Sequence, residues 1–187
     1  MGKILFINAC VRSESRTRIL AGQLLECLGG DFCEVNTTDK SIAPLDHDAL
    51  TKRTEKVRAG DYSCDSFALA RQFAAAESIV VAAPFWDLSF PSFLKIYFEN
   101  ILVSGVTFTY KSGRPQGLCA AKKLYYVTTA GGFISQDFGF SYVKALAESF
   151  FGILEVKCFC AEGLDIVGND IERIMKNAAE RIRREIQ

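Results

Sequence analysis

Residues 10–18 carry side chains that could hold a phosphate group. Ser15 and Thr17 can donate hydroxyl hydrogen bonds, and Arg12 or Arg18 can supply positive charge. A helix is expected directly after this segment, and a helix N-terminus offers unpaired N–H groups and a partial positive charge. Each hydrogen bond to a charged phosphate oxygen contributes roughly 1.5–3 kcal/mol, so three or four would anchor a phosphate. A solvated helix start with a serine cap would use the same residue types.

The same segment contains neither a Gly-x-Gly-x-x-Gly nor a Gly-Lys-Ser/Thr pattern. This disfavours a Rossmann dinucleotide loop and a Walker-type nucleotide site.

Residues 83–91 present aromatic side chains between two prolines. Phe85 and Trp86 are costly at an exposed strand end unless they cover a flat apolar group. Proline fixes the path of the backbone and so makes the segment rigid. The alternative is a small hydrophobic cluster under the following helix.

Residues 128–133 contain two consecutive glycines, Gly131 and Gly132. Glycine lets the backbone approach a ligand closely and aim N–H groups at it. An ordinary turn after a strand would use the same glycines.

An alternation of strand-like and helix-like segments positions these residues. The strand pattern covers residues 3–9, 32–36, 78–83, 124–129 and 154–160. Helical spacing of apolar residues covers 16–28, 66–76, 91–101, 138–151 and 170–186, with a weaker pattern over 46–58. Asn169 is the expected N-cap of the last helix, with Glu172 three residues on.

Five strands separated by helices predict a doubly wound α/β fold, with a five-stranded parallel sheet and helices on both faces. Residues 1–187 are expected to form a single domain, because this length suits one core. Such sheets bind ligands outside the carboxyl ends of their strands. The segments 10–18, 83–91 and 128–133 each follow a strand, so we expect them to meet in one site.

Composition narrows the classes of partner. Lys plus Arg and Asp plus Glu number 22 each, so no charge surplus favours nucleic acid or a membrane surface. No apolar run approaches the length that a bilayer requires, and the opening residues read as a strand rather than a signal peptide. The seven cysteines include no Cys-x-x-Cys pair, which indicates free thiols in a reducing cytoplasm. The sole histidine, His47, lies apart from them, so no metal site is expected.

Several motifs resemble the family of FMN-dependent NADH azoreductases and NAD(P)H:quinone oxidoreductases. Residues 12–20 resemble its Arg-x-x-Ser-x-Ser-x-x-Leu phosphate loop, and residues 84–95 resemble its Pro-Met-Tyr/Trp-Asn-Phe motif with the following Pro-x-x-Leu-Lys. Residues 104–118 resemble Ala-Gly-Val-Thr-Phe-x-Tyr with a later Gly-Leu, residues 129–132 resemble Ser-x-Gly-Gly, and residues 150–153 resemble Phe-x-Gly-Ile. The motifs keep the family's order along most of the chain.

This resemblance implies a flavodoxin-like fold with strand order 2-1-3-4-5 that binds FMN and takes electrons from NADH or NADPH. It implies a two-step hydride exchange that reduces a quinone, azo compound or nitroaromatic, in a cytoplasmic homodimer. It assigns no catalytic acid, base or nucleophile and no metal. The residues it implies in cofactor binding are Cys10, Arg12, Ser15, Thr17, Arg18, Pro84, Phe85, Trp86, Asp87, Thr129, Ala130, Gly131 and Gly132.

Two residues depart from the family pattern: Asp87 replaces its Asn and Phe85 replaces its Met. An ionised carboxylate cannot donate the hydrogen bond that an amide gives, and its charge would lower the flavin potential.

Two other functions stay open. The first is an electron-carrier flavodoxin without a substrate of its own, although such carriers are usually strongly acidic and use a Thr-x-Thr-Gly-x-Thr loop. The second is a flavin-free regulatory domain of the same fold.

Overall fold

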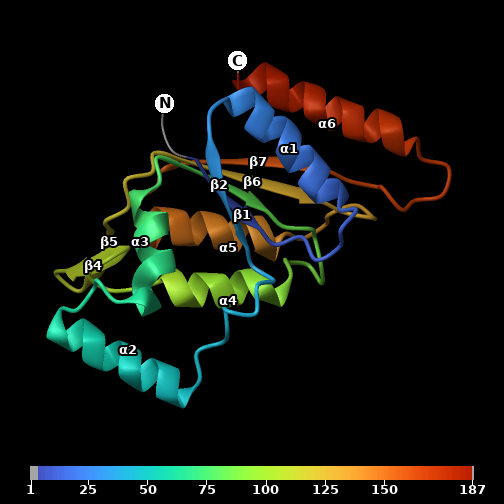
Figure 1. Ribbon diagram of the computed structural model, residues 1–187. Coiled ribbons are helices and arrows are strands. Elements are labelled where there is room, and N and C mark those ends of the chain that lie inside the picture. The colour runs from blue at the N-terminus through green and yellow to red at the C-terminus, as the bar shows by residue number, and fades with distance from the viewer. Residues whose placement is uncertain (1–3, 187) are drawn as a thin grey trace.

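A computed structural model describes residues 4–186 and has a parallel sheet at its centre (Figure 1). The sheet has five strands in the order β2-β1-β3-β6-β7. Its strands are β1 (Ile4–Asn8), β2 (Phe32–Asn36), β3 (Ser78–Ala82), β6 (Lys123–Thr129) and β7 (Glu155–Ala161). Since β6 and β7 are the fourth and fifth strands of this sheet, the predicted flavodoxin-like order 2-1-3-4-5 is confirmed. Each predicted strand end lies within one residue of the observed end, except that Lys3 lies outside the described residues.

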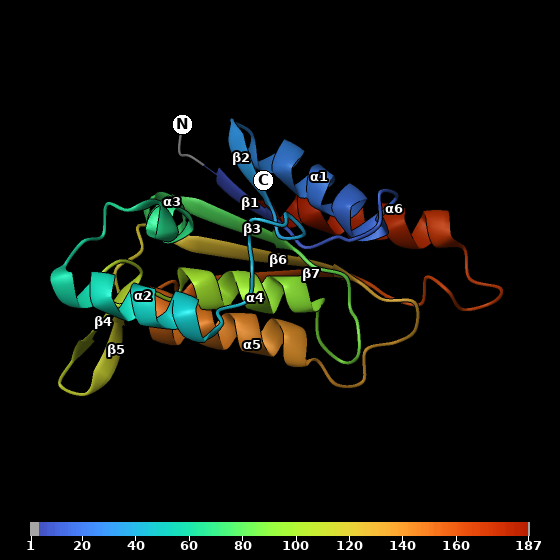
Figure 2. The same cartoon turned by 60° about the horizontal axis from the view of Figure 1, so that its bottom comes forward.

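Helices cover both faces of the sheet (Figures 1 and 2). One face carries α1 (Arg16–Leu28) and α6 (Ile171–Ile186), and the other carries α3 (Ala68–Ala75), α4 (Ser92–Ile101) and α5 (Phe138–Leu146). Successive side chains of a strand point to opposite faces. Val80 therefore joins the core under α1 with Leu20, whereas Val81 joins the core under α4 with Leu94. Burial on both sides explains why the central strands are continuous apolar runs.

The register of the strands brings their carboxyl ends to one edge. Asn8 of β1 pairs with Ala82 of β3, and Ala82 pairs with Val127 of β6. The β6–β7 pairing continues to Thr129 and Ala161. The chain segments that follow these four strands therefore emerge side by side.

Residues 104–118 hold a hairpin that the sequence pattern did not predict. Its strands are β4 (Phe108–Lys111) and β5 (Arg114–Gly117), which pair antiparallel. The two residues between them, Ser112 and Gly113, have φ values of +53° and +76°, as a type I′ turn requires. The strands are short, and Phe108 is their one buried residue, so they carry no run of apolar residues.

Helix ends differ from the sequence prediction in three places. The predicted helix over 138–151 is divided into α5 and a π-helical turn (Ala147–Phe151), and the helix predicted over 66–76 begins with a 3-10 turn (Asp65–Phe67). The Asn169 cap is wrong: Asp170 Oδ1 accepts from the Arg173 N–H at 2.9 Å, whereas the Asn169 amide donates to Gly163 O at 2.8 Å. The weakly patterned helix exists as α2 (His47–Ala59), with Asp46 as its N-cap.

All seven cysteines are free thiols. Burial raises the pKa of Cys119 and of Cys158 to about 12, so both stay protonated at neutral pH. Within residues 4–186, no helix combines the length and the apolar character that a membrane crossing needs.

Candidate functional site

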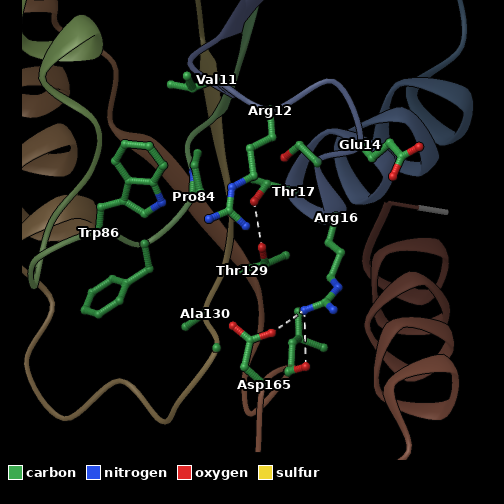
Figure 3. Close-up of a pocket in the computed structure, with 14 residues that line it drawn as sticks. Val11, Arg12, Glu14, Arg16, Thr17, Pro84, Trp86, Thr129, Ala130 and Asp165 are labelled. Atoms are coloured by element: carbon green, nitrogen blue, oxygen red, sulfur yellow. Dashed lines mark hydrogen bonds and ion pairs between the residues drawn. The ribbon is translucent and has the colours of Figure 1, made fainter.

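A cavity of about 300 Å³ opens at the carboxyl edge of the sheet (Figure 3). This volume is in the range of small-molecule and cofactor sites. It lies among the segments that follow β1, β3, β6 and β7. Its lining residues are Val11, Arg12, Glu14, Ser15, Arg16, Thr17, Pro84, Phe85, Trp86, Thr129, Ala130, Gly131, Leu164 and Asp165.

The first turn of α1 forms one wall of the cavity. Ser15 is the N-cap of this helix, and its hydroxyl oxygen accepts from the Arg18 N–H at 3.3 Å. The N–H groups of Arg16 and Thr17 belong to the first turn, which has no carbonyl partners of its own within the helix. Together with the helix dipole they make this wall suitable for an anion.

A buried hydroxyl pair joins the first segment to the third. Thr17 Oγ1 lies 2.6 Å from Thr129 Oγ1, and both side chains are almost fully buried. Figure 3 shows this contact near the centre of the view, with the Arg12 guanidinium drawn beside it. The start of α1 is thereby held against the end of β6.

A tight turn fixes the aromatic wall. Trp86 and Ser89 exchange two backbone hydrogen bonds, of 3.1 and 2.7 Å, across Asp87 and Leu88. These two residues have φ values of +50° and +64°, which a type I′ turn needs. Asp tolerates this left-handed region better than most residues, whereas Leu is strained there.

Neighbouring segments anchor this turn at both ends. The Phe85 N–H donates to Thr129 O at 3.0 Å, and the Phe138 N–H donates to Leu88 O at 2.9 Å. Trp86 therefore stands on a fixed backbone, with 40% of its surface exposed at the mouth of the cavity.

The third wall consists of two adjacent loops. Gly131 O accepts from the Asp165 N–H, and Gly132 O accepts from the Gly163 N–H, each at 2.9 Å. The N–H groups of Gly131 and Gly132 donate to no backbone group in residues 4–186. The carbonyl groups of both glycines are therefore bonded within the described chain, whereas their N–H groups are not.

The four charged residues that line the cavity are evenly divided between acids and bases. Arg16 forms an ion pair with Asp165, with 2.8 Å between Nη1 and Oδ1. Arg12 and Glu14 form no ion pair within the described chain, and both are exposed. Arg12 is therefore the cation most available to an incoming anion.

Comparison with known proteins matches this chain almost end to end. A family model described as a flavodoxin-like fold matches residues 2–186. The FMN-dependent NADH:quinone oxidoreductase 2 of Clostridium acetobutylicum is 33% identical over 195 residues, covering 97% of this chain and 96% of the relative. The FMN-dependent NADH:quinone oxidoreductase of Lachnoclostridium phytofermentans is 29% identical over 198 residues, with coverage of 97% and 96%.

The chain belongs to the family of FMN-dependent NADH:quinone oxidoreductases.

Solved structures agree on the fold of this family. An azoreductase of Bacillus anthracis strain Sterne superposes with a TM-score of 0.85 at 22% identity, covering 100% of this chain and 99% of the other. An FMN-dependent NADH-azoreductase of Bacillus anthracis strain Ames Ancestor, solved in complex with FMN, gives 0.83 at 22% identity, with coverage of 100% and 98%.

Most of the residues predicted to bind cofactor in this family member line the cavity. They are Arg12, Ser15, Thr17, Pro84, Phe85, Trp86, Thr129, Ala130 and Gly131. Four others are not part of the lining. Cys10 is buried at the start of the first segment, where its N–H donates to Asn8 Oδ1 at 3.0 Å. Asp87 is exposed at the tip of the tight turn, and Gly132 lies beside the lining.

Arg18 points away from the cavity. Its guanidinium pairs with the carboxylate of Glu34 on β2, with 3.0 Å between Nη2 and Oε2, and lies over the Phe6 ring. The hydrogen bond from Arg18 lowers the pKa of Glu34. Asn8 also donates to Glu34 Oε1, at 2.9 Å, so this carboxylate already has two partners.

Sequence reasoning missed five lining residues. Val11, Glu14 and Arg16 lie inside the predicted first segment but were not singled out. Leu164 and Asp165 follow β7, and the prediction considered only the first, third and fourth strands of the sheet. Leu164 and Asp165 could have been predicted from their position after a fifth parallel strand, because the segments that follow all the parallel strands lie at the same edge of the sheet.

Proposed function

We propose that this protein binds FMN in the cavity and uses it to reduce a quinone with electrons from NADH or NADPH. The observation that carries the proposal is the convergence of three complementary walls. A helix N-terminus with hydroxyls and Arg12, an aromatic pair, and Gly131, whose N–H donates to no backbone group of the described chain, line one space. A phosphorylated planar ring needs these three surfaces. The relatives named above carry FMN, NADH and quinone in their names.

Each wall receives a role in this proposal. Ser15, Thr17 and Arg12 would hold the phosphate, with the free N–H groups of the first turn of α1. Pro84, Phe85 and Trp86 would line the ring and keep water from it. Asp87 would stand at the edge of this wall, since it lies at the tip of the turn.

The N–H groups of Gly131 and Gly132 would donate to the ring edge where negative charge gathers on reduction. Thr129 and Ala130 position these glycines from the end of β6. FMN held there would supply the two-electron redox chemistry, which we propose to be a two-step hydride exchange between the nicotinamide and the acceptor. Cys10 and Arg18 would act from behind the phosphate loop, without touching the ligand.

Azo compounds and nitroaromatics are proposed as further acceptors, because two structural relatives are called azoreductases. We place the enzyme in the cytoplasm as a homodimer, with residues 1–187 as one domain. Exposed apolar side chains near the cavity, among them Trp86, Leu88 and Phe138, would be covered in such a dimer.

A flavin and turnover assay tests the proposal. The purified protein should take up FMN and oxidise NADH or NADPH only when both FMN and a simple benzoquinone are present. Separate assays with the two nicotinamides would show which donor it prefers. A protein that takes up no FMN would refute the proposal. FMN uptake without quinone-dependent turnover would favour the electron carrier instead.

The Thr17 hydroxyl provides a test of the phosphate wall. Thr17→Val should weaken FMN binding by about ten- to a hundredfold, because a hydrogen bond to a charged oxygen is worth roughly 1.5–3 kcal/mol. Binding of riboflavin, which lacks the phosphate, should weaken less. Titration of flavin fluorescence measures both dissociation constants.

A matched control is Thr51→Val on α2. The Thr51 hydroxyl donates to His47 O at 2.9 Å on an exposed helix, far along the chain from the cavity lining. Its replacement should change neither constant. Equal losses of FMN and riboflavin binding in Thr17→Val would contradict the assigned role.

A further inference from the structure

Asp165 contacts two separate walls of the cavity at once. Its carboxylate Oδ1 accepts from Arg16 Nη1 at 2.8 Å, and its N–H donates to Gly131 O at 2.9 Å. Arg16 is the first residue of α1, where the phosphate wall begins. Gly131 carries one of the two unused N–H groups. Asp165 therefore links the proposed phosphate wall to the proposed ring-edge wall.

The Arg16 side chain strengthens this link. Its Nη1 also donates to Leu164 O at 3.1 Å, so one guanidinium holds two consecutive residues of the loop after β7. Figure 3 shows Arg16 and Asp165 pointing toward each other below the Thr17–Thr129 pair. Residues 165–170 are otherwise exposed to solvent, so these contacts fix the start of an open loop.

Gly131 provides the space for the Asp165 carboxylate. A Cβ atom at this position would lie 2.3 Å from Asp165 Oδ2 and 3.0 Å from its Cγ. A Cβ atom at Gly132, by contrast, would meet nothing within 4 Å. The absence of a side chain at Gly131 therefore makes room for the Asp165 carboxylate, whereas a Cβ at Gly132 would meet no neighbouring atom of the described chain.

We propose that Asp165 is a positioning residue that holds two walls of the cofactor cavity together by fixing Arg16 and Gly131 relative to each other. The proposal rests on the proposed function, since it concerns retention of the flavin. Breaking the link would let the loops after β6 and β7 move away from α1, and the bound flavin would leave faster. Both members of the pair are partly exposed, with 40% and 72% of their side-chain surface accessible. Exposed ion pairs add little to global stability, so loss of this pair should act locally.

Flavin dissociation rates test this role. Asp165→Ala should release FMN and riboflavin about three to five times faster than the wild type, the effect of a partly exposed pair acting on one local opening. Riboflavin matters because it lacks the phosphate, so a direct contact between Arg16 and phosphate cannot explain its faster release. The thermal unfolding midpoint of the flavin-free protein should stay unchanged. Fluorescence recovery after dilution measures both rates.

Two further variants probe the same link from its other members. Arg16→Met should accelerate riboflavin release at least as much as Asp165→Ala, because it also removes the hydrogen bond to Leu164 O. The double variant should be no faster than Arg16→Met alone. Gly131→Ala should also accelerate release, because its Cβ displaces the carboxylate. The control is Glu155→Gln, which breaks the exposed pair with Lys123 of 3.2 Å at the opposite end of β6 and β7. Its release rates should equal those of the wild type.

The outcomes separate this inference from the function on which it rests. If the wild type binds flavin and Asp165→Ala releases both flavins at the wild-type rate, the positioning role is wrong. Slower FMN release with unchanged riboflavin release would also overturn it, because Asp165 would then compete with the phosphate for Arg16. A wild-type protein that binds no flavin would instead overturn the proposed function.

Discussion

Glu34 links three elements behind the phosphate loop. Its carboxylate on β2 pairs with Arg18 of α1 and accepts from Asn8 of β1. The hydrogen bond from Arg18 is the largest cause of its lowered pKa. A carboxyl group with a lowered folded pKa stabilises the protein above its unfolded pKa, about 4.3 for Glu. This contribution is lost as the pH falls through the folded pKa.

Glu34→Gln should therefore lower the free energy of unfolding at pH 7, and the difference from the wild type should shrink below about pH 4. Urea unfolding at pH 7, 5, 4 and 3 measures this difference. In an Arg18→Leu background, the effect of Glu34→Gln on the free energy of unfolding should depend less on pH. The hydrogen bond that mainly lowers the pKa of Glu34 is absent in that background. A difference that stays constant with pH would contradict the assignment.

The site was predictable where a residue's place follows from its position at a strand end. Ser15, Thr17 and Thr129 were found this way, because parallel strands bring the following segments to one edge. Arg16 and Arg18 could not be told apart by the same reasoning. Their directions depend on partners distant in the sequence: Asp165 attracts Arg16, and Glu34 attracts Arg18.

Among the secondary-structure elements, those with a buried face were predictable. The predicted bounds of the first helix match α1 because its apolar residues repeat at helical spacing and Gly29 ends it. The β4–β5 hairpin has little buried surface, and Pro115 in β5 opposes a strand assignment. The cap of α6 depended on a tertiary contact, because Gly163 O attracts the Asn169 amide and leaves Asp170 as the cap.

Two glycines in these elements should respond in opposite ways to alanine. Gly22 lies inside α1, and a Cβ there would meet nothing within 4 Å. Gly22→Ala should therefore stabilise the protein by about 0.5–1 kcal/mol, since glycine is a poor helix former. A Cβ at Gly117 of β5 would lie 2.2 Å from the backbone of Phe151 and Gly152. Gly117→Ala should destabilise the protein by about 1–3 kcal/mol, because backbone atoms cannot move aside cheaply.

Urea unfolding of both variants at one pH checks these signs. A stabilised Gly117→Ala variant would mean that the hairpin does not pack against the π-helical turn as closely as the structure has it. A destabilised Gly22→Ala variant would mean that α1 has a neighbour on that face.

At the scale of the whole molecule, α2 is the helix least embedded in the core. It has no buried residue, and it lies apart from the sheet in Figures 1 and 2. Arg53 holds it by donating to Glu99 O at 2.7 Å and to Leu102 O, the carbonyls at the C-terminal end of α4. Burial of this guanidinium lowers the pKa of Arg53. A helix end is a favourable place for a cation, because its carbonyls are unpaired and carry partial negative charge.

Arg53→Met should therefore loosen α2 alone. Segments with few buried contacts open independently of the core, so amide hydrogen exchange should speed up across α2 while β3 and β6 keep their wild-type protection. The exposed neighbour Lys52 provides the matched control, since Lys52→Met removes one positive charge from the same helix without touching α4. Faster exchange in the central strands would mean that α2 stabilises the whole fold. Unchanged exchange in α2 would mean that Val57, which packs against the core, holds the helix without Arg53.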